Sequence, residues 1–89
     1  MKLDAKFYGE IRKVKNDEVV PEDEYIVFLA KDNVVPAMLR FYQNRCLALG
    51  ADAEQVAAVQ RMINRVDQWR AENPDRLKVP DAAGEKLLG

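Results

Sequence analysis

Histidine, serine and threonine are absent from this 89-residue chain, and cysteine occurs only once. Without these residues there is no Ser or Thr nucleophile, no imidazole for proton transfer and no histidine ligand for a metal ion. A single cysteine, Cys46, cannot form a disulfide within the chain, and no imidazole is present to activate its thiol. We therefore predict a protein that is not an enzyme and that holds no metal ion or cofactor.

Long apolar runs and an excess of charge of one sign are also missing. The longest apolar run, Tyr25–Ala30, is far shorter than the ~20 residues of a membrane span, and residues 1–6 lack the apolar core of a signal peptide. The chain has 14 Lys and Arg against 15 Asp and Glu. This balance argues against a dedicated nucleic-acid binder, and we expect a cytoplasmic protein that does not bind membranes.

The residues that are present are typical of a globular protein. Apolar residues make up 48% of the chain and charged residues 33%. A chain of this mass can bury about 64% of its surface, which is enough for one small core. The predicted fold class is α+β in a single small domain. It has a strand pair within residues 1–33, an antiparallel helical hairpin over 34–73 and a C-terminal arm over 74–89.

The strand pair is predicted from two segments with different patterns. Residues 7–14 alternate between apolar and charged side chains, as in a partly exposed strand. Residues 25–30 are continuously apolar, with β-branched and aromatic side chains, as in a buried strand. Between them, residues 16–24 are acidic and contain a proline, which favours a loop. We expect the two segments to pair as a hairpin with a long loop.

The first helix is predicted to run from residue 34 or 35 to residue 49. Either Asp32 or Asn33 could cap it, because both side chains accept hydrogen bonds from the first-turn amides. Pro36 is tolerated in the first turn, where its missing N–H costs nothing. Gly50 is the expected left-handed residue at its end.

The second helix is predicted over residues 53–72. Asp52 and Gln55 resemble a capping box, and the dipeptide Asn73-Pro74 ends the helix. Its short connection to the first helix predicts an antiparallel hairpin. Apolar spacings predict the faces that pack together: Val56, Val59, Met62, Ile63, Val66 and Trp69 on the second helix, and Met38, Leu39, Phe41, Tyr42, Cys46 and Leu49 on the first.

Candidate binding residues are the helix side chains Arg40, Arg61, Arg65 and Trp69. Arginine forks suit carboxylates, phosphates and protein interfaces, and tryptophan is enriched at interfaces. The favoured interpretation is nevertheless an internally paired, solvated face for the arginines, with Trp69 in the core or at its rim. The nearby acidic partners would be Glu54, Asp67 and Glu72.

Three other features favour structural roles. The acidic residues 22–24 could hold a hard cation, but no calcium-loop spacing is present, so a solvated loop is the better interpretation. Residues 31–33 precede a helix N-terminus that could bind an anion, but no glycine-rich loop accompanies them, so simple capping is favoured. Cys46 lies on the apolar face and is interpreted as a buried structural thiol.

A resemblance extends over roughly residues 21–81. The segments that carry it are Glu24–Asn33, Pro36, Leu39–Tyr42, Cys46, Gly50-Ala51, Met62, Val66, Trp69 and Lys78–Asp81. This arrangement resembles a group of small uncharacterised bacteriophage and prophage accessory proteins. The resemblance implies expression in a bacterial host, and it implies no active-site residues.

The function predicted from these observations is non-catalytic protein–protein interaction, which could modulate a host process or defence. The apolar faces are wide for a two-stranded sheet to cover, so we also expect a symmetric homodimer. One alternative is a binding module for a small anionic ligand such as a nucleotide, through Arg40, Arg61 or Arg65. Another is nucleic-acid binding through these arginines together with Arg12, Lys13 and Lys15.

Overall fold

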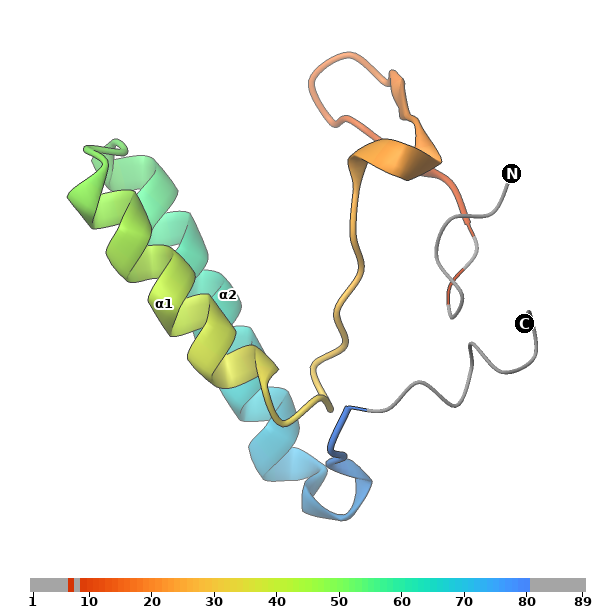
Figure 1. The fold of residues 1–89 in the computed structure, drawn as a ribbon, viewed down its shortest axis with the longest axis vertical. Coiled ribbons are helices and arrows are strands. Elements are labelled where there is room, and N and C mark those ends of the chain that lie inside the picture. Colours follow the sequence, from red (N-terminus) through yellow and green to blue (C-terminus); the bar gives the residue numbers. More distant parts are fainter. Residues whose placement is uncertain (1–6, 8, 81–89) are drawn as a thin grey trace. The chain divides into compact units, whose positions relative to one another are not determined.

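The structure, a computed structural model, describes Phe7 and residues 9–80. Backbone contacts divide these residues into two compact units, with a boundary between Val27 and Phe28. The first unit contains a two-stranded antiparallel hairpin and the second contains two helices, which confirms the predicted α+β class with a helical hairpin (Figure 1). The single domain stays a prediction, and the end of the predicted arm, residues 81–89, lies outside the described residues.

The hairpin of the first unit joins β1, Ile11–Arg12, to β2, Val19–Val20. Ile11 pairs with Val20, and Arg12 pairs with Val19. The connecting turn is closed by the Lys13 amide, which donates to the Glu18 carbonyl at 2.8 Å.

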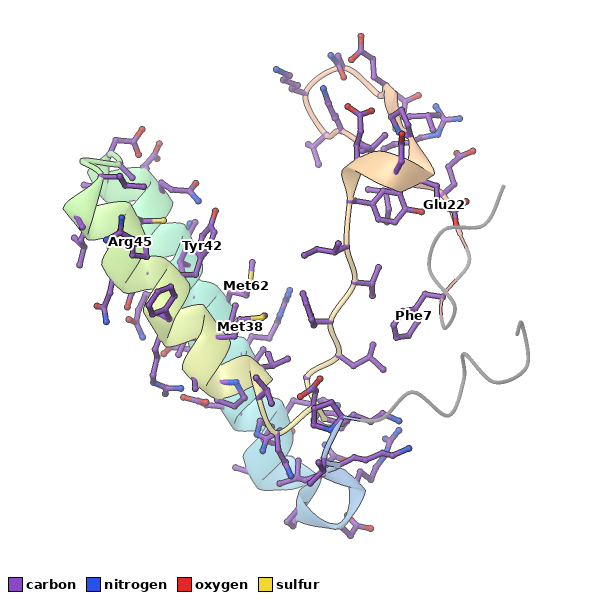
Figure 2. The ribbon with its side chains drawn as sticks, in the orientation of Figure 1. Phe7, Glu22, Met38, Tyr42, Arg45 and Met62 are labelled. Carbon is purple, nitrogen blue, oxygen red and sulfur yellow. The ribbon has the colours of Figure 1, made fainter. Side chains whose placement is uncertain are left out.

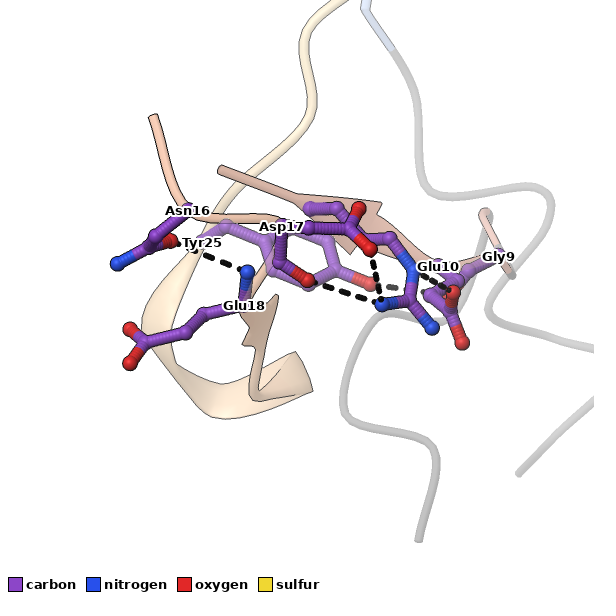
Figure 3. A network of polar contacts seen from close by, with 7 residues as sticks. Gly9, Glu10, Asn16, Asp17, Glu18 and Tyr25 are labelled. Atoms are coloured by element: carbon purple, nitrogen blue, oxygen red, sulfur yellow. Dashed lines mark hydrogen bonds and ion pairs between the residues drawn. The ribbon is translucent and has the colours of Figure 1, made fainter. Parts of the chain in front are cut away.

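Polar contacts hold this turn in place (Figure 3). Asp17 has a positive φ of 60°, a conformation that aspartate tolerates in turns. The Arg12 guanidinium donates to the Asp17 carbonyl at 2.9 Å and to the Glu10 carboxylate at 2.6 Å. Tyr25 follows a short 3₁₀ helix, η1 (Glu22–Glu24), and its hydroxyl donates to the Gly9 carbonyl at 3.3 Å. The turn is thus stabilised by local side-chain bonds and has no buried core residue of its own.

The prediction of a strand over residues 25–30 is wrong. Residues 25–29 have no strand conformation, and Ile26 is 79% exposed. The second strand is instead Val19–Val20, within the segment predicted to be a loop. The shorter connection costs less closure entropy than a loop reaching residue 25, and two β-branched valines suit the pairing.

The first helix of the second unit, α1, spans Val35–Ala48, close to its prediction. The Asp32 side chain accepts from the Val34 amide at 2.8 Å. It therefore closes the turn before the helix, and the predicted side-chain cap on α1 itself is wrong, because the N-cap residue is Val34. At the other end Gly50 has a φ of 76°, as predicted. The amides of Gly50 and Ala51 donate to the Leu47 and Cys46 carbonyls, the pattern of a Schellman motif.

The second helix, α2, spans Ala53–Glu72, as predicted. The Asp52 carboxylate accepts from the Gln55 amide at 2.8 Å, which confirms Asp52 as the cap. Asn73 ends the helix, and its side-chain amide donates to the Trp69 carbonyl at 2.8 Å.

The core lies between α1 and α2 (Figure 1). Its buried side chains are Val35, Leu39, Val59, Ile63 and Val66. The predicted face of α2 is thereby confirmed at its centre. On α1, the predictions for Tyr42 and Leu49 in the core and for Phe41 beside it are wrong, because these side chains are 53%, 76% and 69% exposed. The face of α1 that meets α2 is rotated toward Val35 and the half-buried Gln43.

The chain returns to the start of α1 after η2, Pro74–Arg76. Lys78 forms an isolated parallel bridge with Asp32. The Asn33 amide donates to the Lys78 carbonyl, and the Lys78 amide donates to the Lys31 carbonyl, both at 2.9 Å. The described part of the predicted arm is thus hydrogen-bonded to the turn that precedes α1.

Candidate functional site

One side of the α1–α2 pair, which we call the closed flank, carries polar side chains that satisfy one another. Its residues are Arg40, Gln43, Gln60, Asn64 and Asp67. Arg40 donates to Asp67 at 2.6 Å across the two helices. The Gln43 amide donates to the Gln60 side chain at 2.9 Å and to the Val56 carbonyl at 3.3 Å, and Gln60 donates to Asn64 at 3.0 Å.

The other side, which we call the open flank, carries apolar side chains that remain partly exposed. Its residues are Met38, Tyr42, Met62, Arg65 and Trp69. Figure 2 shows Met38, Tyr42 and Met62 on the same side of the helical pair. Met62 is 44% exposed and Tyr42 is 53% exposed, although both are large apolar side chains. The open flank therefore leaves apolar surface in contact with water.

A pocket of about 380 Å³ lies on the open flank. Its lining combines core residues with the open-flank side chains and with the segment before α1: Phe28, Ala30, Val35, Met38, Leu39, Met62, Arg65, Val66 and Trp69. All of these residues belong to the second unit. Among the described residues that line the pocket, Arg65 is the only charged one, so the pocket can accept an apolar group while it offers one cation to a bound carboxylate.

The wall formed by Phe28 and Ala30 is positioned by Arg70 of α2. The Arg70 guanidinium donates to the carbonyls of Ala30 and Asp32 at 3.0 and 3.1 Å and to the Asn33 side chain at 2.8 Å. These three bonds join the turn before α1 to the last turns of α2. Arg70 was not among the predicted site residues, because no local pattern links it to carbonyls about 40 positions earlier in the chain.

The charges near the pocket are poorly compensated. Arg61 and Arg65 lie one turn apart on α2 and are exposed, and neither side chain has a hydrogen-bond or ion-pair partner among residues 7 and 9–80. Trp69 is half-buried, and the Arg76 guanidinium lies 5.3 Å from the centre of its ring. A partner that brings a carboxylate to this flank would meet a free guanidinium.

The four predicted binding residues thus divide between the two flanks. Arg65 and Trp69 both line the pocket, and Arg61 lies one turn from Arg65. Arg40 is committed to Asp67 on the closed flank. The structure therefore does not bring Arg40 together with Arg65. Within the part of the chain that the structure describes, the predicted internal pairing holds for Arg40 and not for Arg61 or Arg65.

The remaining candidate features are reported for the described residues only. Within them no group of three or more Cys, Asp or Glu side chains is arranged to hold a metal ion. Residues 22–24 form η1, and Cys46 is half-buried in α1. Neither α1 nor α2 combines the length and the apolar character that a membrane crossing requires.

Comparisons with models of protein families, with curated proteins and with solved structures found no match.

Proposed function

We propose that this protein is a non-catalytic interaction module that binds another protein chain on its open flank. The observation that supports the proposal is the pocket on this flank. Its lining includes the partly exposed apolar side chains of Phe28 and Met62, and its one charged residue, Arg65, is unpaired within the described residues. An exposed apolar surface of this kind is stabilised when a partner removes it from water.

The side chains of the pocket suit a protein partner. Met38 and Met62 are flexible and can adapt to the shape of an inserted apolar side chain. Trp69 and Arg65 belong to residue types that are enriched at the energetic centres of interfaces. An arginine at the rim would bind a carboxylate of the partner and fix its orientation. Such a protein would act by occupying a surface, which requires no reacting group of its own.

Photochemical cross-linking from the open flank tests the proposal. A benzophenone amino acid is placed at Met62 and, as the matched control, at Asn64 on the closed flank, two residues further along the same helix and rotated by about 200° from Met62. After irradiation of living bacteria that express each variant, we expect protein adducts from position 62 and few from position 64. Equal adduct yields at the two positions would refute the proposal, as would no protein adduct at position 62.

A second candidate function is the binding of a small amphipathic anion in the same pocket. It is favoured by one observation, the position of Arg65 in an otherwise apolar lining. Native mass spectrometry of the untagged protein at low salt separates the two candidates. A retained mass of a few hundred daltons per chain, lost in the variant Arg65→Ala, would support the small ligand.

The predicted role as a phage accessory protein in a bacterial host depends on the sequence resemblance alone. It would make the bound chain either a host component or a copy of this protein. The masses of the cross-linked adducts distinguish these two sources.

A further inference from the structure

We propose that the chain bound on the open flank is a second copy of this protein, with its α2 packed antiparallel against α2 of the first copy. This inference rests on the proposed function and specifies the partner. The observation that supports it is the arrangement of opposite charges along the exposed side of α2.

Glu54 and Arg65 lie eleven residues apart on α2, which is about three turns of helix. Successive residues are rotated by about 100°, so the two side chains leave the helix within about 20° of the same direction. Both are exposed, and neither has an ion-pair partner in the part of the chain that the structure describes. Each of them is therefore available to an external charge of opposite sign.

A two-fold axis perpendicular to α2, midway between the two charges, exchanges them. In the resulting antiparallel pair, each Arg65 lies opposite Glu54 of the other copy, so two equivalent ion pairs form. A parallel pair would instead place Arg65 opposite Arg65 and Glu54 opposite Glu54. Like charges placed opposite one another are destabilising, so the charge pattern selects the antiparallel arrangement.

The side chains between the two charges allow the helices to approach. Ala58 is small, and it lies between Glu54 and Arg65 on the same side of the helix. Met62 is 44% exposed and can cover the alanine side of the other copy. In this pairing Arg61 also lies opposite Ala58 of the other copy, where its long side chain can extend to solvent.

The presence of both signs of charge favours a second copy over an unrelated acidic partner. A partner carrying only carboxylates would satisfy Arg65 and would meet repulsion at Glu54. A second copy gives both residues a partner, because the ion pair between Arg65 and Glu54 of the other copy forms twice in the symmetric pair. Self-complementarity of this kind is the requirement for a closed symmetric dimer.

A charge-reversal cycle tests the proposal on the full chain. Sedimentation equilibrium of the wild-type protein is expected to give a dimer at tens of micromolar, with dissociation on dilution. E54R and R65E should each raise the dimer dissociation constant about tenfold or more, because two ion pairs become two repulsive contacts. The double variant E54R/R65E restores opposite charges, so it should return to within about threefold of the wild-type value.

R40E is the matched control, because it makes the same charge reversal on the closed flank. It should leave the dimer dissociation constant within about threefold of wild type. Circular dichroism at 222 nm shows whether each variant is folded. If a reversal unfolds the chain, the neutral variants E54Q and R65Q replace it, and each should weaken the dimer about threefold.

Two results would overturn the inference. One is a wild-type protein that remains monomeric at about 100 µM, a concentration roughly a hundred thousand times the dissociation constant of a nanomolar complex. The other is a double variant that dimerises no better than the single ones. The proposed function would survive either result if cross-linking from Met62 gave an adduct with a different protein. It would fail separately if position 62 gave no protein adduct.

Discussion

On the closed flank Arg40 reaches across from α1 to Asp67 at 2.6 Å, whereas on the open flank Arg65 has no ion-pair partner within the described residues. The two flanks share the same helices and the same core. They differ in whether polar side chains of α1 form hydrogen bonds with side chains of α2. On one side Gln43 meets Gln60, and on the other side methionine and tryptophan side chains surround a pocket.

This difference separates residues that hold the helices together from residues that are free to bind. Polar side chains that satisfy one another gain little from a further partner, because a new contact must first break an existing one. Apolar side chains and an unpaired guanidinium have no contact with another side chain that a partner must first break. They gain when another chain excludes water from the flank. Recognition is therefore expected on one flank only.

The largest expected effect distinguishes the core from the open flank at adjacent positions. Ile63 is 3% exposed, and the variant Ile63→Ala should lower the free energy of unfolding by about 3 kcal/mol. Its neighbour Met62 points to the open flank, and Met62→Ala should cost less than about 1 kcal/mol. Urea unfolding followed by circular dichroism, at a protein concentration that keeps the chain monomeric, measures both. Similar losses at the two positions would contradict the boundary between core and flank.

The next effect concerns the wall of the pocket. Arg70→Ala removes three hydrogen bonds to the turn before α1 and should cost about 2 kcal/mol. The amides of Asn33 and Lys78 bond within the segment that Arg70 holds, so their hydrogen exchange should accelerate about thirtyfold. Arg61→Ala on the same helix is the control and should leave both exchange rates unchanged. Unchanged exchange in Arg70→Ala would show that the wall is held by other contacts.

The helices could be predicted from the sequence because their boundaries depend on local signals. Gly50 needs no distant partner to adopt its positive φ, and Asp52 caps the amide of Gln55 three residues later. The strand pair depends on which segments meet. Residues 25–30 have strong strand propensity, but Val19 and Val20 are closer to Ile11 along the chain, and Val20 pairs with Ile11 instead.

The packed face of α1 and the wall of the pocket could not be predicted for a related reason. On α1, a face through Tyr42 and one through Gln43 both include Leu39, and the apolar pattern favoured Tyr42. The structure uses Gln43, because Gln60 and the Val56 carbonyl accept its side-chain hydrogen bonds. Arg65 and Trp69 were recognised from residue type and spacing alone. They line a pocket only together with Phe28, whose position depends on contacts between distant parts of the chain.

The smallest expected effect tests whether the closed flank stabilises the helical pair at all. The side chains of Arg40 and Asp67 are 51% and 44% exposed, so water screens their attraction. A double-mutant cycle with Arg40→Ala and Asp67→Ala should give a coupling energy of about 0.5 kcal/mol in urea unfolding, and this coupling should fall as salt is raised to 1 M. A cycle between Arg65 and Asp67 serves as the control and should give no coupling, since Arg65 lies on the other flank. A coupling above about 2 kcal/mol for Arg40 and Asp67 would mean that the closed flank contributes to stability on the scale of a core residue. The contrast between the flanks would then be one of stability as well as of binding, and closed-flank substitutions could no longer serve as neutral controls for the open flank.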